Sequence, residues 1–459
     1  MYGQTRPGLF PKLTRRWLQG SPSASQELQL PDQPKPKGDR IARLTHPESG
    51  AGGEPSKGAN KLSLRRVLTS SVALLAIAGV IAVCAAAASA HSGSSTGNRL
   101  LVGVLAPLTG PNAAQGEDMV RATKLAVNAA NKAGGIRGQK IELDVQDDQC
   151  TAQVGAQAAE KLVSDGVVAV VGAYCSAAAL PEENVFVRSH NIPFILTVAS
   201  NPKLTAQGYT NVIRMIGTDA EEAPADVYYM NDVLKLSKVA ILGDGTAFSL
   251  SEGQAITSVL QSKTKIQITS NGAITPGQSD YTAALLNVAK DHPEALYYTG
   301  FYTEFALIVK QWAAIGKPFK LIGGVSTIDS SVLQADGSLM LDKSLSQVTY
   351  PTTQLYNNKL ASAYKAQYVK SYHVQPGPYS TFQYDGTLVL IQALKKSAST
   401  SPSVLDKALR AVKITGTTGQ LTFNSKTGDR PTFKFFAVRG AGSGSSLHYT
   451  VVYGLKTSV

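Results

Sequence analysis

The sequence predicts an α/β fold in which two similar doubly wound parallel-sheet lobes are joined by a hinge. The first observation is an alternation of short apolar strands with helices that begins near residue 99. The second is that this alternation breaks at about 201–236 and then restarts. Repeated strand–helix–strand units imply parallel strands with helices on both faces of a sheet. A chain of 459 residues is also long enough for two or three domains.

Residues 1–60 precede this pattern and carry no sustained apolar period. They hold eight of the 22 prolines. Such a stretch buries too little surface to offset the entropy lost on ordering. We therefore predict a disordered N-terminal extension.

Residues 61–90 have the layout of an export signal. Lys61, Arg65 and Arg66 form a basic start, and an almost uncharged apolar stretch at 67–83 is followed by small residues. The alternative is a retained transmembrane anchor, since the stretch is nearly long enough to span a bilayer. We expect export to the periplasm or cell surface.

Two processing sites compete within this signal. The stretch Ala88-Ser89-Ala90 before His91 fits ordinary signal cleavage. Residues 81–84 instead resemble a bacterial lipobox, in which Cys84 becomes the lipid-bearing N-terminus that anchors the protein to the membrane. Val83 is larger than the residue usual before that cysteine. Both readings stay open.

The net charge of +12 comes from 44 basic and 32 acidic residues. Residues 1–90 hold 12 of the basic and 5 of the acidic residues, which leaves 32 and 27 for the rest. The folded part is therefore only mildly basic, and it has no Arg/Lys stripe with interleaved aromatics. We predict no nucleic-acid partner.

The first α/β run alternates regularly from residue 99 to 200. Strands are expected at 99–108, 140–147, 167–174 and 192–200, with helices at 116–135, 151–166 and 178–191. The second run has strands at 238–245, 265–270, 294–300 and 319–326, with helices from about 249 and at 281–293 and 304–316. Three helices (355–372, 381–397, 401–413) and three strand-like segments (419–430, 432–440, 448–454) follow. We predict that lobe 1 comprises 99–218 plus about 348–430, and lobe 2 comprises 219–347 plus about 431–459.

Catalytic motifs are missing from the sequence. It contains no GxSxG, HExxH or GxxxxGK[ST], and no GxGxxG after a strand. The six histidines are scattered, which disfavours metal or general-base clusters. We predict that the protein is not an enzyme and holds neither metal nor cofactor. Ligands of open parallel sheets bind beyond the carboxyl ends of the strands, so the site is expected in the cleft between the lobes.

Cysteine usage points to a disulfide. Once Cys84 is removed or lipidated, Cys150 and Cys175 remain in an oxidising compartment, where two cysteines of one domain tend to pair. The alternatives are a nucleophile, a metal ligand or ordinary core. Two cysteines are too few for a structural zinc site.

From about residue 99 to 459 the chain resembles the type I periplasmic binding proteins, in particular their leucine/isoleucine/valine-binding branch. The resemblance rests on VGVLAPLTGPNAAQGEDM, NAANKAGGIRGQKIELDVQDDQC, VGAYCSAAA, ASNPKLTAQGYTNVIRM and TGTTGQLTFNSKTGDR, in the family's order. It implies a solute-binding protein of an ABC importer that takes up a small polar solute by hinge closure and acts, as a monomer, with a membrane permease. The alternative is a receptor domain that feeds a signalling partner.

The resemblance also implies site residues. Cys150 and Cys175 match the family's disulfide. Ser176 and Ser200 match the hydroxyls that hold a ligand carboxylate, and Val198 matches a backbone-carbonyl contact. The alternative for the two serines is a turn or N-cap hydroxyl. Gln115, Phe248, Phe301 and Tyr379 match the walls of the ligand pocket, and Tyr302 lies one residue from Phe301. The alternative for these residues is ordinary packing of aromatic side chains in the core.

One departure concerns the family's glutamate that pairs with the ligand ammonium. Val325 or Ser326 stands at that place. A buried ammonium without a counter-charge is costly. Asp329 or Glu304 could substitute. The ligand is therefore expected to be a branched-chain amino acid, an amide or a small carboxylate.

Overall fold

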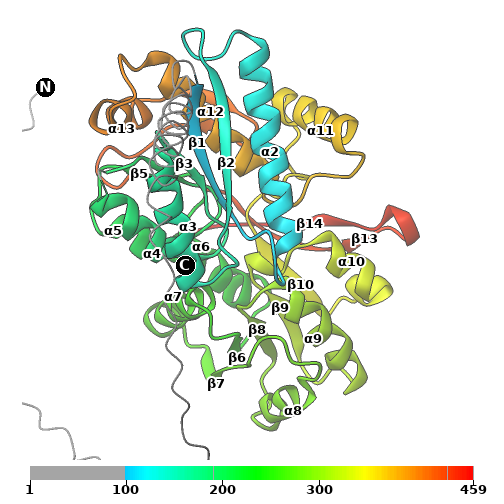
Figure 1. The fold of residues 1–459 in the computed structure, drawn as a ribbon. Coiled ribbons are helices and arrows are strands. Elements are labelled where there is room, and N and C mark those ends of the chain that lie inside the picture. The colour runs from blue at the N-terminus through cyan, green and yellow to red at the C-terminus, as the bar shows by residue number, and fades with distance from the viewer. Residues whose placement is uncertain (1–98, 190, 432, 458–459) are drawn as a thin grey trace, which may run out of the picture. The chain divides into compact units, whose positions relative to one another are not determined.

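A computed structural model of the chain describes residues 99–189, 191–431 and 433–457 (Figure 1). The expected N-terminal extension, the export signal and Cys84 lie outside the described residues. Within the part of the chain that is described, no helix is long and apolar enough to cross a bilayer.

The first sheet has five parallel strands in the order β2-β1-β3-β4-β5. Apolar residues set its register, because β1 faces β2 through Leu100↔Ile141 and Val102↔Leu143. The sequence did not predict β5, whose three residues are too short to show a period. The strands are β1 (Arg99–Ala106), β2 (Lys140–Asp147), β3 (Val170–Gly172), β4 (Phe194–Leu196) and β5 (Val212–Arg214).

Helices connect these strands, and local signals fix where they begin and end. The Thr151 side chain accepts a hydrogen bond from the backbone N–H of Val154 and so caps the start of α3. Gly166 ends the same helix at a φ of 79°, a left-handed conformation that suits glycine. The connecting helices are α2 (Ala113–Lys132), α3 (Ala152–Asp165), α4 (Ser176–Arg188) and the short α5 (Lys203–Ala206).

The second sheet has seven strands in the order β14-β13-β10-β9-β8-β6-β7. Its parallel part consists of β6 (Lys238–Gly243), β7 (Gln267–Ala273), β8 (Ala295–Tyr298), β9 (Lys320–Gly323) and β10 (Leu345–Thr349). Its helices are α6 (Asp219–Tyr228) with π-helical η1 (Tyr229–Val233), α7 (Ala247–Lys263), α8 (Thr282–Lys290), α9 (Tyr302–Ala314), η2 (Val325–Thr327), α10 (Ser330–Asp336) and η3 (Gly337–Leu341).

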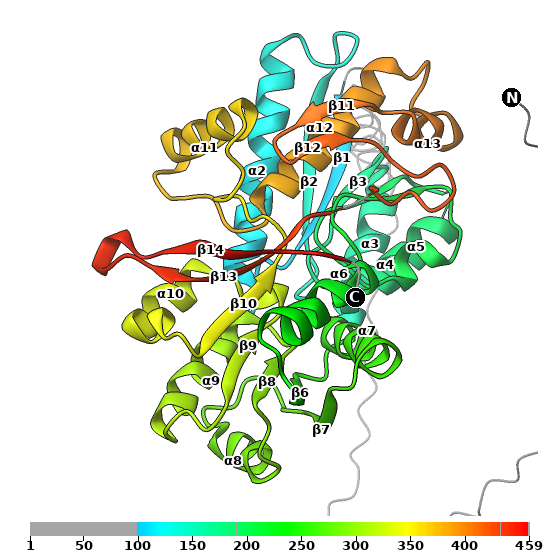
Figure 2. The same ribbon diagram turned by 180° about the vertical axis from the view of Figure 1, so that it is seen from behind.

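The last two strands of this sheet are antiparallel, whereas the sequence predicted parallel lobes. β13 (Phe435–Ala441) runs against β10, and β14 (His448–Leu455) runs against β13. Only residues 442–447, with the turn η4 (Gly444–Ser446), connect the two. A connection this short permits a hairpin but not the crossover that parallel strands require. Figure 2 shows the hairpin as a red arm that extends outward past α10.

Three helices from late in the chain return to the first sheet. They are α11 (Lys359–Tyr372), α12 (Ser380–Lys396) and α13 (Pro402–Arg410), and the small pair β11 (Ile414–Gly416) and β12 (Gly419–Leu421) follows them. Close packing of α12 on β4 leaves no room for a side chain at Gly386, where a Cβ would come within 2.7 Å of Thr197. The chain thus passes from one sheet to the other three times, after β5, after β10 and after β12.

One apolar core extends across both sheets. It includes Val104 and Ile195 of the first sheet together with Phe248, Phe301 and Val325 on the side of the second. This shared core lies where the carboxyl ends of both sets of parallel strands meet. That is the place at which α/β sheets bind ligands.

Candidate ligand-binding site

A small cavity lies between the two sheets at this point, and its empty space of about 340 Å³ includes open solvent at its mouth. Its walls come from the first residues after several strands. Tyr174 follows β3, Val198 and Ser200 follow β4, and Phe301 follows β8. The full lining is Tyr174, Val198, Ser200, Ile216, Phe248, Phe301, Val325, Ser326, Tyr350 and Tyr379.

Aromatic rings dominate this inner cavity. Tyr174 stands 6.0 Å from Phe301 and 6.4 Å from Tyr379, measured between ring centroids. Burial raises the pKa of Tyr174 and Tyr379 well above the usual range, so both hydroxyls stay neutral. No aspartate, glutamate, lysine or arginine lines this cavity among the described residues. Its polar groups are therefore hydroxyls and backbone dipoles.

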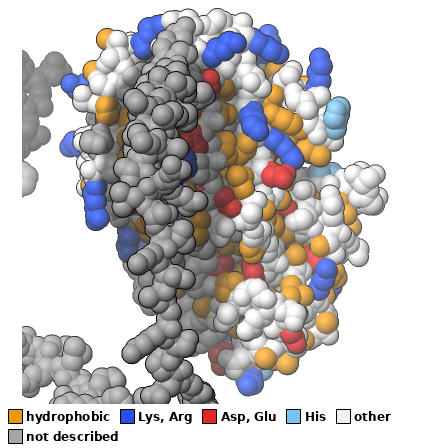
Figure 3. Space-filling model, viewed as in Figure 1, with side chains coloured by type: hydrophobic (Ala, Val, Ile, Leu, Met, Phe, Trp, Pro, Cys, Tyr) orange, Lys and Arg blue, Asp and Glu red, His pale blue; other side chains and the backbone are white. Residues whose placement is uncertain are grey.

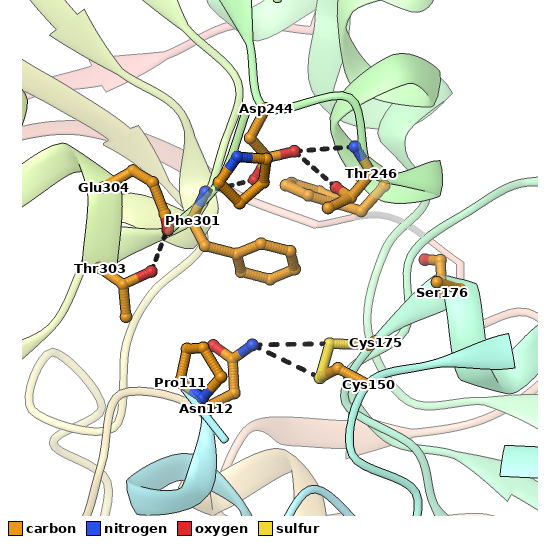
Figure 4. Close-up of a pocket in the computed structure, with 13 residues that line it drawn as sticks. Pro111, Asn112, Cys150, Cys175, Ser176, Asp244, Thr246, Phe301, Thr303 and Glu304 are labelled. Carbon is orange, nitrogen blue, oxygen red and sulfur yellow. Dashed lines mark hydrogen bonds between the residues drawn. A yellow bond between two sulfur atoms is a disulfide. The ribbon is translucent and has the colours of Figure 1, made fainter. Parts of the chain in front are cut away.

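A second pocket lies beside it and holds about 460 Å³ of empty space (Figure 4). Phe248 and Phe301, whose ring centroids are 5.4 Å apart, line both pockets. Unlike the inner cavity, the outer pocket has acids in its lining, Asp244 and Glu304. Besides the two phenylalanines, its lining residues are Pro111, Asn112, Cys150, Cys175, Ser176, Ala177, Asp244, Thr246, Pro276, Thr303 and Glu304.

The two serines named by the sequence lie in different pockets. Ser200 lines the inner cavity, and Ser176, the first residue of α4, lines the outer one. The Ser176 hydroxyl accepts a hydrogen bond from the backbone N–H of Asn201 at 3.3 Å. It therefore joins the turn after β4 to the start of α4, which is close to the alternative reading of a turn hydroxyl. Contact with a ligand remains a prediction for both serines.

Gln115 and Tyr302 line neither pocket; they connect the two sides of the molecule. Gln115 on α2 donates from Nε2 to Oδ2 of Asp329 at 2.5 Å. The Tyr302 hydroxyl donates to the carbonyl of Pro111 at 3.1 Å. Tyr379, which does line the inner cavity, donates its hydroxyl to the carbonyl of Val325. These contacts hold the two sides together over the cavity.

The disulfide between Cys150 and Cys175 is present, which confirms the predicted pair. It joins the segment after β2 to the start of α4, and it forms part of the outer pocket wall in Figure 4. Asn112 Nδ2 lies 3.5 Å from the Cys150 sulfur. The bridge thereby fixes three segments around the pocket.

The acids that could replace the missing glutamate already have partners. Asp329 accepts from Gln115 and also from the backbone N–H of Ser331 at 2.7 Å, and it lines neither pocket. Glu304 lines the outer pocket and accepts from the N–H of Gly277 at 3.3 Å. Val325 itself lies at the inner cavity wall. The place of the glutamate is therefore apolar.

A fully buried arginine shapes the turn that carries Ser200. Arg214 at the end of β5 donates to the carbonyls of Ala199 and Asn201 at 3.3 and 3.0 Å. Its Nε pairs with Asp429 at 2.9 Å. Asp429 belongs to TGTTGQLTFNSKTGDR, one of the stretches on which the resemblance rests. Through Arg214, this stretch stabilises the turn that carries Ser200 without lining the cavity.

Some lining residues were not among the expected ones. Tyr174 directly precedes Cys175 at the end of a predicted strand, so its position was a usable signal. Ile216 and Tyr350 lie in the passages between the two sheets, where no periodic pattern marks them. Asp244 accepts from the N–H of Phe301 at 3.1 Å and so positions that ring.

Two α/β halves that meet over a small cavity lined by aromatic rings and hydroxyls define a class, the two-lobed solute-binding proteins. The family model described as periplasmic binding protein matches residues 100–444. The chain belongs to this family.

Individual relatives agree with that assignment. The Leu/Ile/Val-binding protein homolog 3 of Brucella melitensis is 30% identical over 342 residues, covering 73% of this chain and 90% of that protein. The Leu/Ile/Val-binding protein BraC3 of Rhizobium johnstonii is 32% identical over 225 residues, which is 49% of this chain and 61% of BraC3. The fold matches that of the branched-chain amino acid transporter substrate-binding protein LivJ from Streptococcus pneumoniae, solved with isoleucine, at a TM-score of 0.68 and 21% identity over 77% of this chain and 99% of that one.

Proposed function

We propose that the protein captures a small solute in the inner cavity by closing its two lobes, and that it delivers this solute to the permease of an ABC importer. The observation that carries the proposal is the cavity itself. Residues after β3 and β4 form one wall, and residues after β8 and β9 form the other. A ligand that touches both walls stabilises the closed arrangement over an open one.

The lining favours a solute with a compact apolar body and a neutral or hydrogen-bonding head. Phe248, Phe301 and Val325 suit an apolar group, and the Ser200 hydroxyl suits a carboxylate or amide. The Ser326 hydroxyl already donates to the carbonyl of Gly300 at 2.8 Å, so only its oxygen can accept from a ligand. No fixed negative charge lines the cavity to receive an ammonium. This lining favours amides and small carboxylates over a solute with an ammonium group. The relatives named for leucine, isoleucine and valine add branched-chain amino acids to the candidates.

The proposal extends to the whole molecule. Lobe 1 comprises 99–218 and about 348–430, lobe 2 comprises 219–347 and about 431–459, and the passages near 218, 348 and 430 act as the hinge. The protein is exported and works as a monomer outside the cytoplasm, either cleaved after Ala90 or anchored by a lipid at Cys84. It does no chemistry on the ligand.

We propose no nucleic-acid partner for the protein. On the visible face in Figure 3, basic and acidic side chains are dispersed among neutral ones. Such a surface lacks the continuous positive stripe that nucleic-acid binding needs.

A thermal-shift screen of amino acids, their amides, and short aliphatic and aromatic acids tests the proposal, because a ligand that binds only the folded form raises its melting temperature. We expect one chemical class to raise it in a dose-dependent way, with calorimetry giving one site per chain. Turnover of the bound compound, or no stabilisation by any class, would contradict the proposal.

A further inference from the structure

Three carboxylates meet inside the molecule, on the two helices that pack behind the inner cavity. Asp226 and Glu222 come from α6, and Glu252 comes from α7. All three are fully buried. We call Glu222, Asp226 and Glu252 the carboxylate cluster.

The geometry of the cluster suits a single ion. Each residue offers one oxygen, and these oxygens lie within 4.8 Å of one another. Oxygens that bind one Ca²⁺ at about 2.3–2.6 Å lie at most roughly 5 Å apart. One ion can therefore touch all three side chains without any movement of the helices.

The cluster lacks the partners that buried carboxylates normally have. Both oxygens of Glu222, both of Glu252 and one of Asp226 have no hydrogen-bond partner among the described residues. The other oxygen of Asp226 accepts from the Tyr297 hydroxyl at 2.8 Å. None of the ion pairs found in the described chain includes a member of the cluster. Buried ionised carboxylates need a counter-charge.

A second feature outside the cluster points to the same spot. The hydroxyl of Tyr350 is fully buried and has no partner outside the cluster. It stands beside Glu222, where it acts to lower the pKa of that carboxyl against the effect of burial. A neutral hydroxyl oxygen completes the kind of all-oxygen shell that hard cations take.

From this arrangement we propose that the carboxylate cluster binds one divalent hard cation, Ca²⁺, between α6 and α7. Its two positive charges offset two of the three negative charges of the ionised cluster. Mg²⁺ usually keeps several waters, whereas Ca²⁺ accepts a full set of protein oxygens, some bidentate. Zn²⁺ in proteins prefers nitrogen and sulfur ligands. The expectation that the chain holds no metal rested on histidines and cysteines, and the proposal departs from it.

The position of the ion gives it a structural role. Glu252 packs directly on the backbone of Gly324, where a Cβ would come within 2.2 Å of its Oε1. Val325 and Ser326, the next two residues, line the inner cavity, as does Tyr350. The cation therefore fixes the wall of lobe 2 from behind, without touching the solute.

The rival explanation is that protons alone neutralise the cluster. Burial raises the pKa of Glu222, Asp226 and Glu252 well above the usual range. Glu182 on α4 shows that a lone carboxyl can be buried in this way, because it is also fully buried with both oxygens unpartnered. Glu182 is therefore the matched control.

Metal content and stability of the protein expressed from the full chain decide between the two. The protein is stripped with a chelator, unfolded and refolded with or without about 10 mM CaCl₂, so that a sealed site still loads, and then desalted. We expect about one Ca²⁺ per chain and a melting temperature raised by about 2 °C or more. Glu252→Gln and Asp226→Asn should lose both effects, and Glu182→Gln should keep both.

Less than about 0.1 Ca²⁺ per chain with an unchanged melting temperature would overturn the proposal in favour of protons. Equal Ca²⁺ binding by Glu252→Gln, Asp226→Asn and wild type would place the ion elsewhere and overturn it too. No solute enters these measurements. Their failure therefore leaves the proposed transport function untouched, and the reverse also holds.

Discussion

Gln115 and Asp329 are 214 positions apart in the chain, and the amide of the first donates to the carboxylate of the second at 2.5 Å. Gln115 lies on the side of the first sheet and Asp329 on the side of the second. Both residues are buried. Their contact is thus a latch between the halves, formed outside the cavity.

Removal of this latch should favour an open arrangement. We expect Gln115→Leu to weaken solute binding about two- to tenfold, since it deletes one hydrogen bond to a charged group. Small-angle scattering without solute should show a larger radius of gyration than for wild type. Gln254→Leu on the exposed face of α7 is the control, and equal affinity and radius for both variants would refute the role of the latch.

Ser176→Ala should weaken solute binding at least several-fold. Ser176 is 1% exposed, and its hydroxyl holds the N–H of Asn201 next to Ser200. Its removal leaves that N–H, and any ligand atom it meets, without a partner. Calorimetry with the ligand from the screen measures the effect. Ser262→Ala, at an exposed site on α7, should bind like wild type, and Ser176→Ala with the same affinity would exclude Ser176 from the site.

Reduction of the disulfide should lower the melting temperature. The bridge joins Cys150 and Cys175 across 25 positions. A loop of that length corresponds to about 3 kcal/mol in the chain-entropy account. Calorimetry with and without reductant measures the shift, and the double variant Cys150→Ser/Cys175→Ser should melt at the reduced temperature and ignore reductant. Identical melting of wild type in both conditions would contradict a stabilising bridge.

Ionisation of Asp148 should lower the free energy of unfolding as the pH rises from about 4 to about 7. Burial raises the pKa of Asp148 to about 7, while the neighbouring N–H of Cys150 acts in the opposite direction. The folded state then binds a proton that the unfolded state releases near its lower pKa, so stability is lost across that window and is constant above it. Other buried acids add to the same trend.

Asp148→Asn isolates this contribution, because its amide oxygen can still accept from Cys150 while it cannot ionise. Urea unfolding at several pH values should show that the variant loses less stability than wild type between pH 4 and 7, by at least ~1 kcal/mol. Parallel curves for the two proteins would show that Asp148 ionises normally.

Arg214→Ala should lower the free energy of unfolding by about 3 kcal/mol or more. Arg214 is fully buried and holds Asp429, Ala199 and Asn201 at once. Asp429→Ala leaves the buried guanidinium without its partly exposed counter-charge and should lower the free energy of unfolding by at least ~1 kcal/mol. Urea denaturation measures both. If each variant loses less than ~1 kcal/mol of unfolding free energy, water replaces these contacts, and Arg214 does not stabilise the turn that carries Ser200.

Elements with a strong period were predictable from the sequence, and so was the place of the inner cavity. The strands β3, β4 and β8 follow from apolar runs, and Tyr174, Val198 and Phe301, which come after them, line the inner cavity. Three-residue β5 carries no period. The sequence predicts the two strands β13 and β14. That they run antiparallel follows only from the short turn between them.

Pairings between distant residues were beyond what the sequence could show. Gln115 was expected at the pocket wall; it lines neither pocket and instead reaches Asp329, 214 positions away, because the fold brings α2 next to the segment before α10. The carboxylate cluster was missed for a similar reason. Glu222 and Asp226 share one face of α6, but their approach to Glu252 depends on how α6 packs against α7.

The return of α12 to the first sheet limits the order in which the chain can fold. The five strands that end at Arg214 are made early, but the helix that packs on them comes only with residues 380–396. An N-terminal fragment therefore presents an uncovered apolar surface until those residues have been made. Such long-range contacts form slowly, so a chain exported as proposed would still be unfolded while it passes through a secretion channel.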